Sequence, residues 1–291
     1  NVGIDLGFFN NDLNVNFDWY QRDTKGMLAP GQELPSVLGA SAAYENAGSL
    51  RTRGWELNID WRHVFQDLDN LELHANFNLG DYKATITEWD SKDELNTKYT
   101  GKEYGEIWGF ETDRYFTADD FNADGSYKDG IADQTGLQKD KAFTYGPGDI
   151  KFVDQNNDGV INWGYAIDDA VNNPEGLAPG TKDNHGDLVK IGNETPRYQY
   201  SFRLGGSWKG FDIDLFFQGV GKRDMWSPSA FVMPLTRGAD AIYAWQMDYV
   251  TQEMVDNNTI DQNAMYPRLF PGNAGQGVPG ANIIASGKNN F

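Results

Sequence analysis

Apolar and polar residues alternate with a period of two along several segments of the chain. In LNVNFDW (Leu13–Trp19) the odd-numbered residues are apolar and the even-numbered ones are Asn or Asp. The same alternation recurs in WELNIDW (Trp55–Trp61), LELHANFNL (Leu71–Leu79) and FDIDLFF (Phe211–Phe217). Because successive side chains of a strand point to opposite faces, each segment is predicted to be a β-strand with one apolar and one polar face.

The alternation predicts about six strands, at 1–9, 12–23, 52–64, 71–83, 197–209 and 211–222. Most match the roughly 9–11 residues that cross an outer membrane better than the roughly 5–6 of an ordinary strand. Tight turns alternate with long connections at 24–51, 84–196 and 223–291. Short turns at one end and long extracellular loops at the other are the plan of an outer-membrane barrel, whose smallest bacterial members have about eight strands. The predicted fold is therefore all-β, a section of a large antiparallel transmembrane β-barrel.

Composition narrows the possible functions. The net charge of −19 would repel phosphate backbones, so nucleic acid is not expected as a partner. Cys is absent, which excludes disulfides and thiolate metal sites. A mean hydropathy of −0.62 usually indicates a soluble protein, but barrel strands direct only alternate residues to lipid. The chain opens on Asn1 without a basic and apolar leader, which is typical of a mature fragment.

Several motifs then indicate a family. They are PGDIKFVDQNNDGVIN (147–162), IGNETPRYQYSFRLGGSWKGFDIDLFFQGVGKRD (191–224), GIDLGFFNNDLNVNFDWYQRDTKGML (3–28), GSLRTRGWELNIDW (48–61) and MYPRL (265–269). In this order they resemble the C-terminal section of the barrel in SusC-like (SusC/RagA) TonB-linked outer-membrane transporters of Bacteroidota. One departure is Thr52, where that family usually has Asn.

The resemblance implies a function for the whole protein. Such transporters lie in the outer membrane of Gram-negative bacteria with their loops extracellular. They import a glycan or an oligopeptide together with a SusD-like surface lipoprotein. TonB supplies the energy through a plug and a TonB box, and neither region is in this sequence. The implied partners are thus the lipoprotein, TonB, outer-membrane lipid and the nutrient.

No catalytic set is evident, so a non-enzyme without a required cofactor is expected. The acidic loops are interpreted as solvated surface, because a glycosidase needs two carboxylates at a separation that sequence does not show. The alternative from another class is a soluble calcium-bearing adhesin or carbohydrate-binding β-sandwich. Detergent dependence of the full-length protein distinguishes these two.

One stretch resembles the front of a calcium-binding loop. Oxygen-bearing groups fall at positions 1, 3, 5, 7 and 9 of an EF-hand loop, and Gly159 is at position 6. Position 12 is Tyr165 rather than the bidentate Glu, so a later acid would have to replace it. A tight Asx and glycine turn without an ion is the other interpretation. The candidate Ca²⁺ ligands are Asp154, Asn156, Asp158, the Val160 carbonyl, Asn162 and Asp168.

Tryptophans of the long connections are candidates for contact with substrate or partner. Their rings can stack on sugars and form interface hot spots, or they can pack the cores of loops this long. The candidates are Trp89, Trp108, Trp163, Trp226 and Trp245. A short amphipathic helix is expected over Ala239–Met254.

Overall fold

A computed structural model describes residues 1–30, 39, 43–89, 94–95, 97–137, 144–164, 180–225, 234 and 242–269. The chain divides into two compact units. The sheet unit comprises Asn1–Lys92, Lys98–Glu106 and Asn193–Asp224, and the loop unit comprises Asp93–Thr97, Ile107–Gly192 and Met225–Phe291. Each unit is described by itself below.

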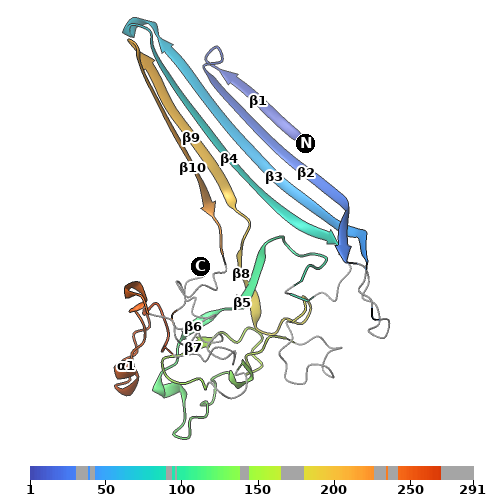
Figure 1. Ribbon diagram of the computed structural model, residues 1–291, viewed down its shortest axis with the longest axis vertical. Coiled ribbons are helices and arrows are strands. Elements are labelled where there is room, and N and C mark those ends of the chain that lie inside the picture. The colour runs from blue at the N-terminus through green and yellow to red at the C-terminus, as the bar shows by residue number, and fades with distance from the viewer. Residues whose placement is uncertain are drawn as a thin grey trace. The chain divides into compact units, whose positions relative to one another are not determined.

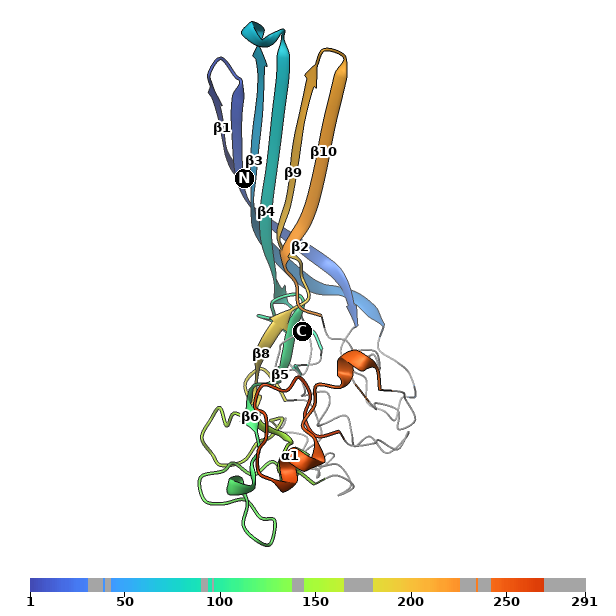
Figure 2. The same ribbon diagram turned by 90° about the vertical axis from the view of Figure 1, so that its left-hand side faces the viewer.

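The sheet unit contains a six-stranded sheet with the order β1-β2-β3-β4-β9-β10, and every neighbouring pair is antiparallel. The turns that join β1 to β2, β3 to β4 and β9 to β10 lie at one end of this sheet (Figures 1 and 2). The last of them has positive φ at Lys209 (50°) and Gly210 (84°), which suits the twist of a two-residue hairpin. The strands are β1 Val2–Phe8, β2 Leu13–Pro30, β3 Tyr44–Phe65, β4 Leu71–Glu88, β9 Arg197–Trp208 and β10 Phe211–Lys222.

The register places alternate rows of side chains on opposite faces. One row that crosses all six strands consists of Ile4, Phe17, Leu57, Leu79, Tyr200 and Gly219. The adjacent row consists of Asp5, Asn16, Asn58, Asn78, Ser201 and Gln218. We call the two sides the apolar face and the polar face.

Large apolar side chains remain exposed on the apolar face. Leu215 is 51% exposed, Ile213 67% and Leu204 46%. A contiguous apolar surface of this kind is rare on a soluble monomer and marks a membrane or partner interface. The other sheets among the described residues have only two strands each. The β-sandwich alternative, which requires a second broad sheet against the apolar face, therefore does not describe this fold.

Three strands extend beyond the lengths that the alternation predicts. β2 continues to Pro30, β3 begins at Tyr44 and β4 continues to Glu88. The range 24–51, expected to be a loop, is therefore largely a continuation of the β2–β3 hairpin. The alternation ends there because apolar and polar residues no longer separate by face, as the consecutive apolar residues Met27, Leu28 and Ala29 show. Backbone pairing nevertheless persists from Thr24 opposite Leu50 to Pro30 opposite Tyr44, interrupted by bulges.

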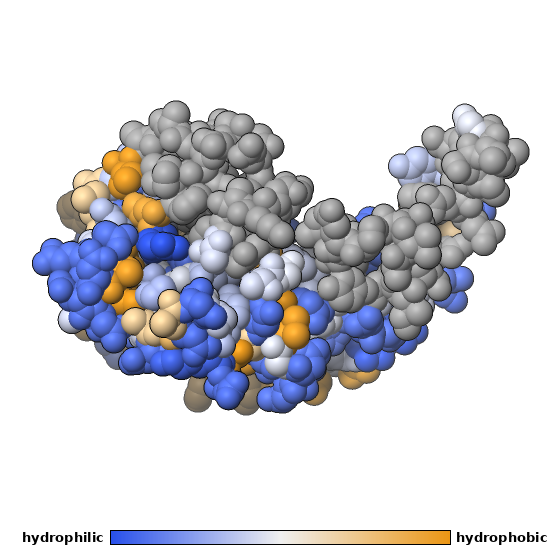
Figure 3. Space-filling view, turned by 90° about the horizontal axis from the view of Figure 1, so that it is seen from below, coloured by the Kyte–Doolittle hydropathy of each residue, from blue (hydrophilic) through white to orange (hydrophobic). Residues whose placement is uncertain are grey.

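The range 84–196, also expected to be one loop, contains much of the folded loop unit. Its short strands are β5 Glu106–Phe110 paired with β8 Leu188–Asn193, and β6 Thr112–Tyr115 paired with β7 Ile150–Phe152. Its core includes Tyr115, Phe116 and Ile161, all fully buried. Strands this short carry too few alternations to be recognised by period. The residues coloured in Figure 3 are mostly hydrophilic, with apolar residues scattered among them.

Two ion pairs tie the loop unit together. Arg114 makes a bidentate contact with the buried Asp120, with nitrogen–oxygen distances of 2.7 and 2.6 Å. Arg268 donates to Asp149, which is fully buried, at 2.7 Å. Each carboxylate is therefore buried with a matching guanidinium, as burial of a charge requires.

The expected helix over Ala239–Met254 is wrong for its described part, 242–254. A 3-10 turn covers Ala244–Gln246, and the α-helix α1 covers only Gln252–Asp256. Between them Tyr249 forms a β-bridge with Tyr266, and Val250 N donates to Tyr266 O at 3.0 Å. Pairing with a distant segment thus overrides the local helical period. Within the described residues, no helix has the length and apolar character needed to cross a membrane.

Candidate transport surface and loop sites

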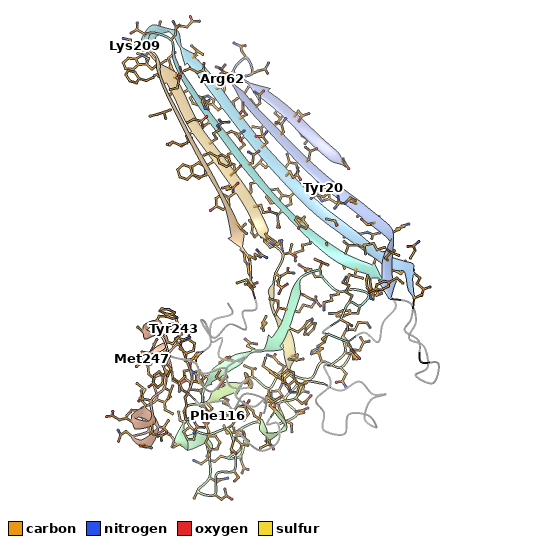
Figure 4. The ribbon with its side chains drawn as sticks, in the orientation of Figure 1. Tyr20, Arg62, Phe116, Lys209, Tyr243 and Met247 are labelled. Atoms are coloured by element: carbon orange, nitrogen blue, oxygen red, sulfur yellow. The ribbon has the colours of Figure 1, made fainter. Side chains whose placement is uncertain are left out.

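The polar face of the sheet unit carries a candidate site, a hollow of about 1050 Å³. Amides, carboxylates and phenols form most of its lining, and Tyr20 marks its place on the sheet in Figure 4. The polar-face residues that line it include Asp5, Asn16, Asp18, Tyr20, Glu56, Asn58, Asn78, Tyr82, Gln199, Ser201 and Gln218. They come from all six strands, because the register aligns their rows.

Hydrogen bonds connect these side chains across neighbouring strands. Asn16 donates to Asp5 at 2.6 Å, and Asn78 donates to Ser201 at 3.3 Å. Asn76, on the same face, donates to Asn58 at 3.0 Å. The face thus presents amide donors and carboxylate acceptors to solvent. Such groups suit reversible hydrogen bonding to hydroxyl or amide groups of a passing solute.

The calcium-like stretch forms a tight turn held by its own side chains. The Asp154 carboxylate accepts from Gly159 N at 2.9 Å, and Asn156 Oδ1 accepts from Asp158 N at 3.0 Å. Asp158 accepts from Val160 N at 2.8 Å. Gly159 has φ of 84°, a conformation that favours glycine. These contacts are those of an Asx and glycine turn.

Asp187 closes this turn, and it is not among the ligands that the sequence predicts. One carboxylate oxygen accepts from Gln155 N at 2.9 Å, and the other accepts from Asn162 N at 2.8 Å. Burial raises the pKa of Asp187 above its ordinary value, and the charges of Asp154 and Asp158 act in the same direction, against the two backbone donors. No sequence signal identified it, because Asp187 lies well outside the length of an EF-hand loop.

The residues of the 154–162 turn meet only some of the requirements of a Ca²⁺ site. Asp154 Oδ1 is buried and has no hydrogen-bond partner, which an ion would satisfy. However, no three His, Asp or Glu side chains in the described part of the chain are grouped so as to hold a metal ion. Asp168, the expected later ligand, lies outside the described residues. Calcium at this turn stays a prediction.

Two of the five tryptophans pack within the loop unit. Trp163 contacts Phe110 edge-on, with 4.9 Å between ring centroids, and packs against the apolar core. Trp108 lies 5.3 Å from the ring of His185. Trp226 lies outside the described residues. Trp163 therefore has the position of a core-forming side chain, whereas Trp108 is half-buried beside His185 and Lys190.

The remaining two tryptophans differ in exposure. Trp89 packs so closely on Gly48 that a Cβ at that glycine would meet its ring at 2.8 Å. Trp245 is 51% exposed and stacks on Tyr243, with 4.6 Å between centroids and 6° between planes. Tyr243 and the exposed Met247 lie close together in Figure 4. Among the described candidates, Trp245 is therefore the best placed to meet a ligand or partner.

The chain is similar in sequence to known receptors. The chain is 23% identical over 231 residues to TonB-dependent receptor P3 of Formosa agariphila, covering 75% of the chain and 19% of the relative. It is 28% identical over 127 residues to TonB-dependent receptor P39 of the same organism, covering 42% of the chain and 12% of the relative. The chain therefore spans about a fifth or less of the curated relatives it matches. No protein-family model matches it.

Solved structures show the same fold. The chain aligns with the RagAB peptide transporter with a TM-score of 0.52 and 17% identity, covering 89% of the chain and 25% of that protein. It aligns with the RagAB peptide importer in the 'open-open' state with a TM-score of 0.54 and 16% identity, covering 90% and 24%. At this identity the likeness concerns the fold alone.

These findings confirm the predicted fold class and the predicted resemblance. The relatives are TonB-dependent receptors, and the antiparallel sheet of this chain has the fold of an open part of a barrel wall. This class of relatives agrees with the resemblance to SusC-like transporters that the sequence motifs indicate. The relatives are receptors and transporters rather than enzymes, in agreement with the expected non-enzyme.

Proposed function

We propose that the full-length protein imports a glycan or an oligopeptide across the outer membrane, powered by TonB and assisted by a SusD-like lipoprotein. The observation that carries this proposal is the two-sided sheet. Its apolar face is exposed along the strands, and its polar face presents hydrogen-bonding groups from six strands. In a barrel wall the first face meets lipid and the second lines the lumen.

The long connections support an extracellular capture role. They begin at the sheet end opposite the three tight turns, as extracellular loops of an outer-membrane barrel do. Folding of the loop unit around its own core gives these loops a stable surface. Exposed aromatic residues such as Trp245 and Tyr243 suit contact with a sugar ring, a peptide side chain or the lipoprotein.

The polar face suits passage rather than chemistry. Arg203 pairs with Asp214 and Arg62 pairs with Glu72, so its cations are largely matched by carboxylates. The unmatched groups are amides and acids, which bind neutral hydroxyl-rich or amide-rich solutes weakly and reversibly. A solute oligomer could therefore exchange hydrogen bonds along the face without being held at one point.

Growth experiments test the proposal. Deletion of the gene for the full-length protein, and separately of its TonB, should abolish growth of the source bacterium on either one class of glycan or one class of oligopeptide. A tagged receptor should copurify with a lipoprotein from detergent-solubilised outer membranes. Unchanged growth on every glycan and peptide tested, or recovery of the full-length protein in plain buffer without detergent, would refute import.

A further inference from the structure

Charged residues replace apolar ones where the apolar face of the sheet passes its last tryptophans. Trp19 stands opposite Trp55, and two residues further along the strands Gln21 stands opposite Arg53, which stands opposite Lys83. Residues two apart on a strand share a face, so Arg53 and Lys83 lie on the same side as the tryptophans. The next row on this side includes Asp23, Arg51 and Thr85.

These rows form a groove of about 480 Å³. Four of its lining residues are cationic and one is a carboxylate, in a chain whose net charge is −19. Together with Asp23 and Glu103, which pair with two of these cations, the groove has four cations and three carboxylates, so positive charge is in slight excess. Its lining residues are Trp19, Arg51, Arg53, Gly54, Trp55, Asp81, Tyr82, Lys83, Thr85, Thr87 and Arg197.

The cations differ in how fully their charge is matched. Arg197 is 17% exposed in its side chain and makes a bidentate pair with Asp81. Arg51 pairs with Asp23, which lies beside the groove, at 2.7 Å.

Lys83 and Arg53 are the cations best placed to meet a ligand. Lys83, 56% exposed, pairs with Glu103 at the longer distance of 3.3 Å. Arg53 is exposed, and its Nε donates to the neutral amide of Gln21 at 2.9 Å.

We propose that this groove binds the phosphate of a membrane-lipid head group. The inference rests on the proposed membrane position of the sheet. Trp side chains lie at the boundary between hydrocarbon and water, and the groove lies directly beyond them, at the level of the head groups. A guanidinium matches phosphate oxygens in geometry and charge, and an ammonium adds a second positive charge. Arg53 and Lys83 supply these groups, and the two tryptophans contact the upper part of the acyl chains.

Lipid binding to the full-length receptor tests the proposal. Native mass spectrometry in detergent compares phosphatidic acid with phosphatidylcholine, and excess inorganic phosphate serves as competitor. Wild type should prefer phosphatidic acid, and R53Q/K83Q should lose most of that preference. A cation near an anionic membrane surface contributes roughly a fivefold gain in affinity, so the double variant should lose roughly 25-fold.

Matched variants make the result specific. R62Q/R203Q removes two cations from the polar face and should retain the lipid preference. R53K keeps the charge and should retain most of the binding, which guards against a fold defect in the double variant.

Other outcomes would overturn the inference. They are equal binding of both lipids by wild type, equal loss in R62Q/R203Q, or displacement of the lipid by inorganic phosphate. A receptor that needs detergent yet shows no lipid preference overturns this inference alone. A receptor that stays monodisperse without detergent overturns the proposed function as well.

Discussion

Replacing Asp187 by Ala should loosen the turn at 154–162. The change removes both acceptors of the Gln155 and Asn162 amides, which join the two ends of the turn. A hydrogen bond to a charged group contributes about 1.5–3 kcal/mol, and a buried donor left unpaired costs about as much. Burial and two nearby acids disfavour the ionised carboxylate, so the lower end of the range applies. The two hydrogen bonds to Asp187 together are therefore expected to contribute about 3 kcal/mol.

Hydrogen exchange on the full-length protein measures this loss. A drop of about 3 kcal/mol in local opening free energy accelerates exchange by roughly two powers of ten. The peptide covering 153–164 should show it. Asp183→Ala, at a side chain that is 80% exposed, is the matched control and should leave exchange unchanged. Wild-type exchange in the Asp187→Ala protein would refute the reasoning that this carboxylate holds the turn.

The Asp187 carboxylate should also make the stability of the turn depend on pH. Its pKa is raised in the folded state, so between the ordinary pKa of Asp and the raised value the folded state binds more protons than the unfolded state. Stability of the turn should therefore fall as pH rises through that window. After correction for intrinsic rates, exchange in 153–164 should increase with pH in wild type and not in Asp187→Asn. The opposite slope would show that the carboxylate is stabilised when ionised.

Three further changes test other features. Ile213→Lys on the apolar face should cost roughly 2–4 kcal/mol in urea unfolding from vesicles, whereas Gln218→Lys on the polar face should cost little; equal costs would contradict the assigned faces. Arg268→Met removes the guanidinium beside the buried Asp149 and should cost about 3–5 kcal/mol of loop-unit stability, so an unchanged denaturation midpoint would count against the ion pair. Calcium calorimetry should give heat in wild type that Asp154→Asn abolishes, and a wild-type protein without heat has no ion site in this turn.

Much of the sheet follows from sequence because strand parity is local. Each alternating segment, such as Leu13–Trp19 or Phe211–Phe217, shows which side chains share a face without reference to any other segment. The ends of the strands are harder to predict from the sequence. Past Thr24 the two faces no longer differ in polarity, and only pairing between β2 and β3 shows that the strands continue.

The candidate sites depended far more on distant contacts. The turn at Asp154 was visible in sequence, but its closing carboxylate, Asp187, has no recognisable spacing from it. Trp163 and Trp245 are the same residue type in similar connections, yet one packs against the core and the other is exposed. Composition gives the number of aromatic residues, but it does not show which of them the fold buries.

Sequence alone thus determined the β class, the two faces of the sheet and, through its motifs, the family that the chain resembles. Tertiary structure decided which residues meet. Arg197 reaches Asp81, and Arg53 stands beside Lys83, because the register of β3, β4 and β9 brings segments far apart in the chain into adjacent rows. The physical reason is that alternation is a property of neighbouring residues, whereas register is set by the packing of whole strands.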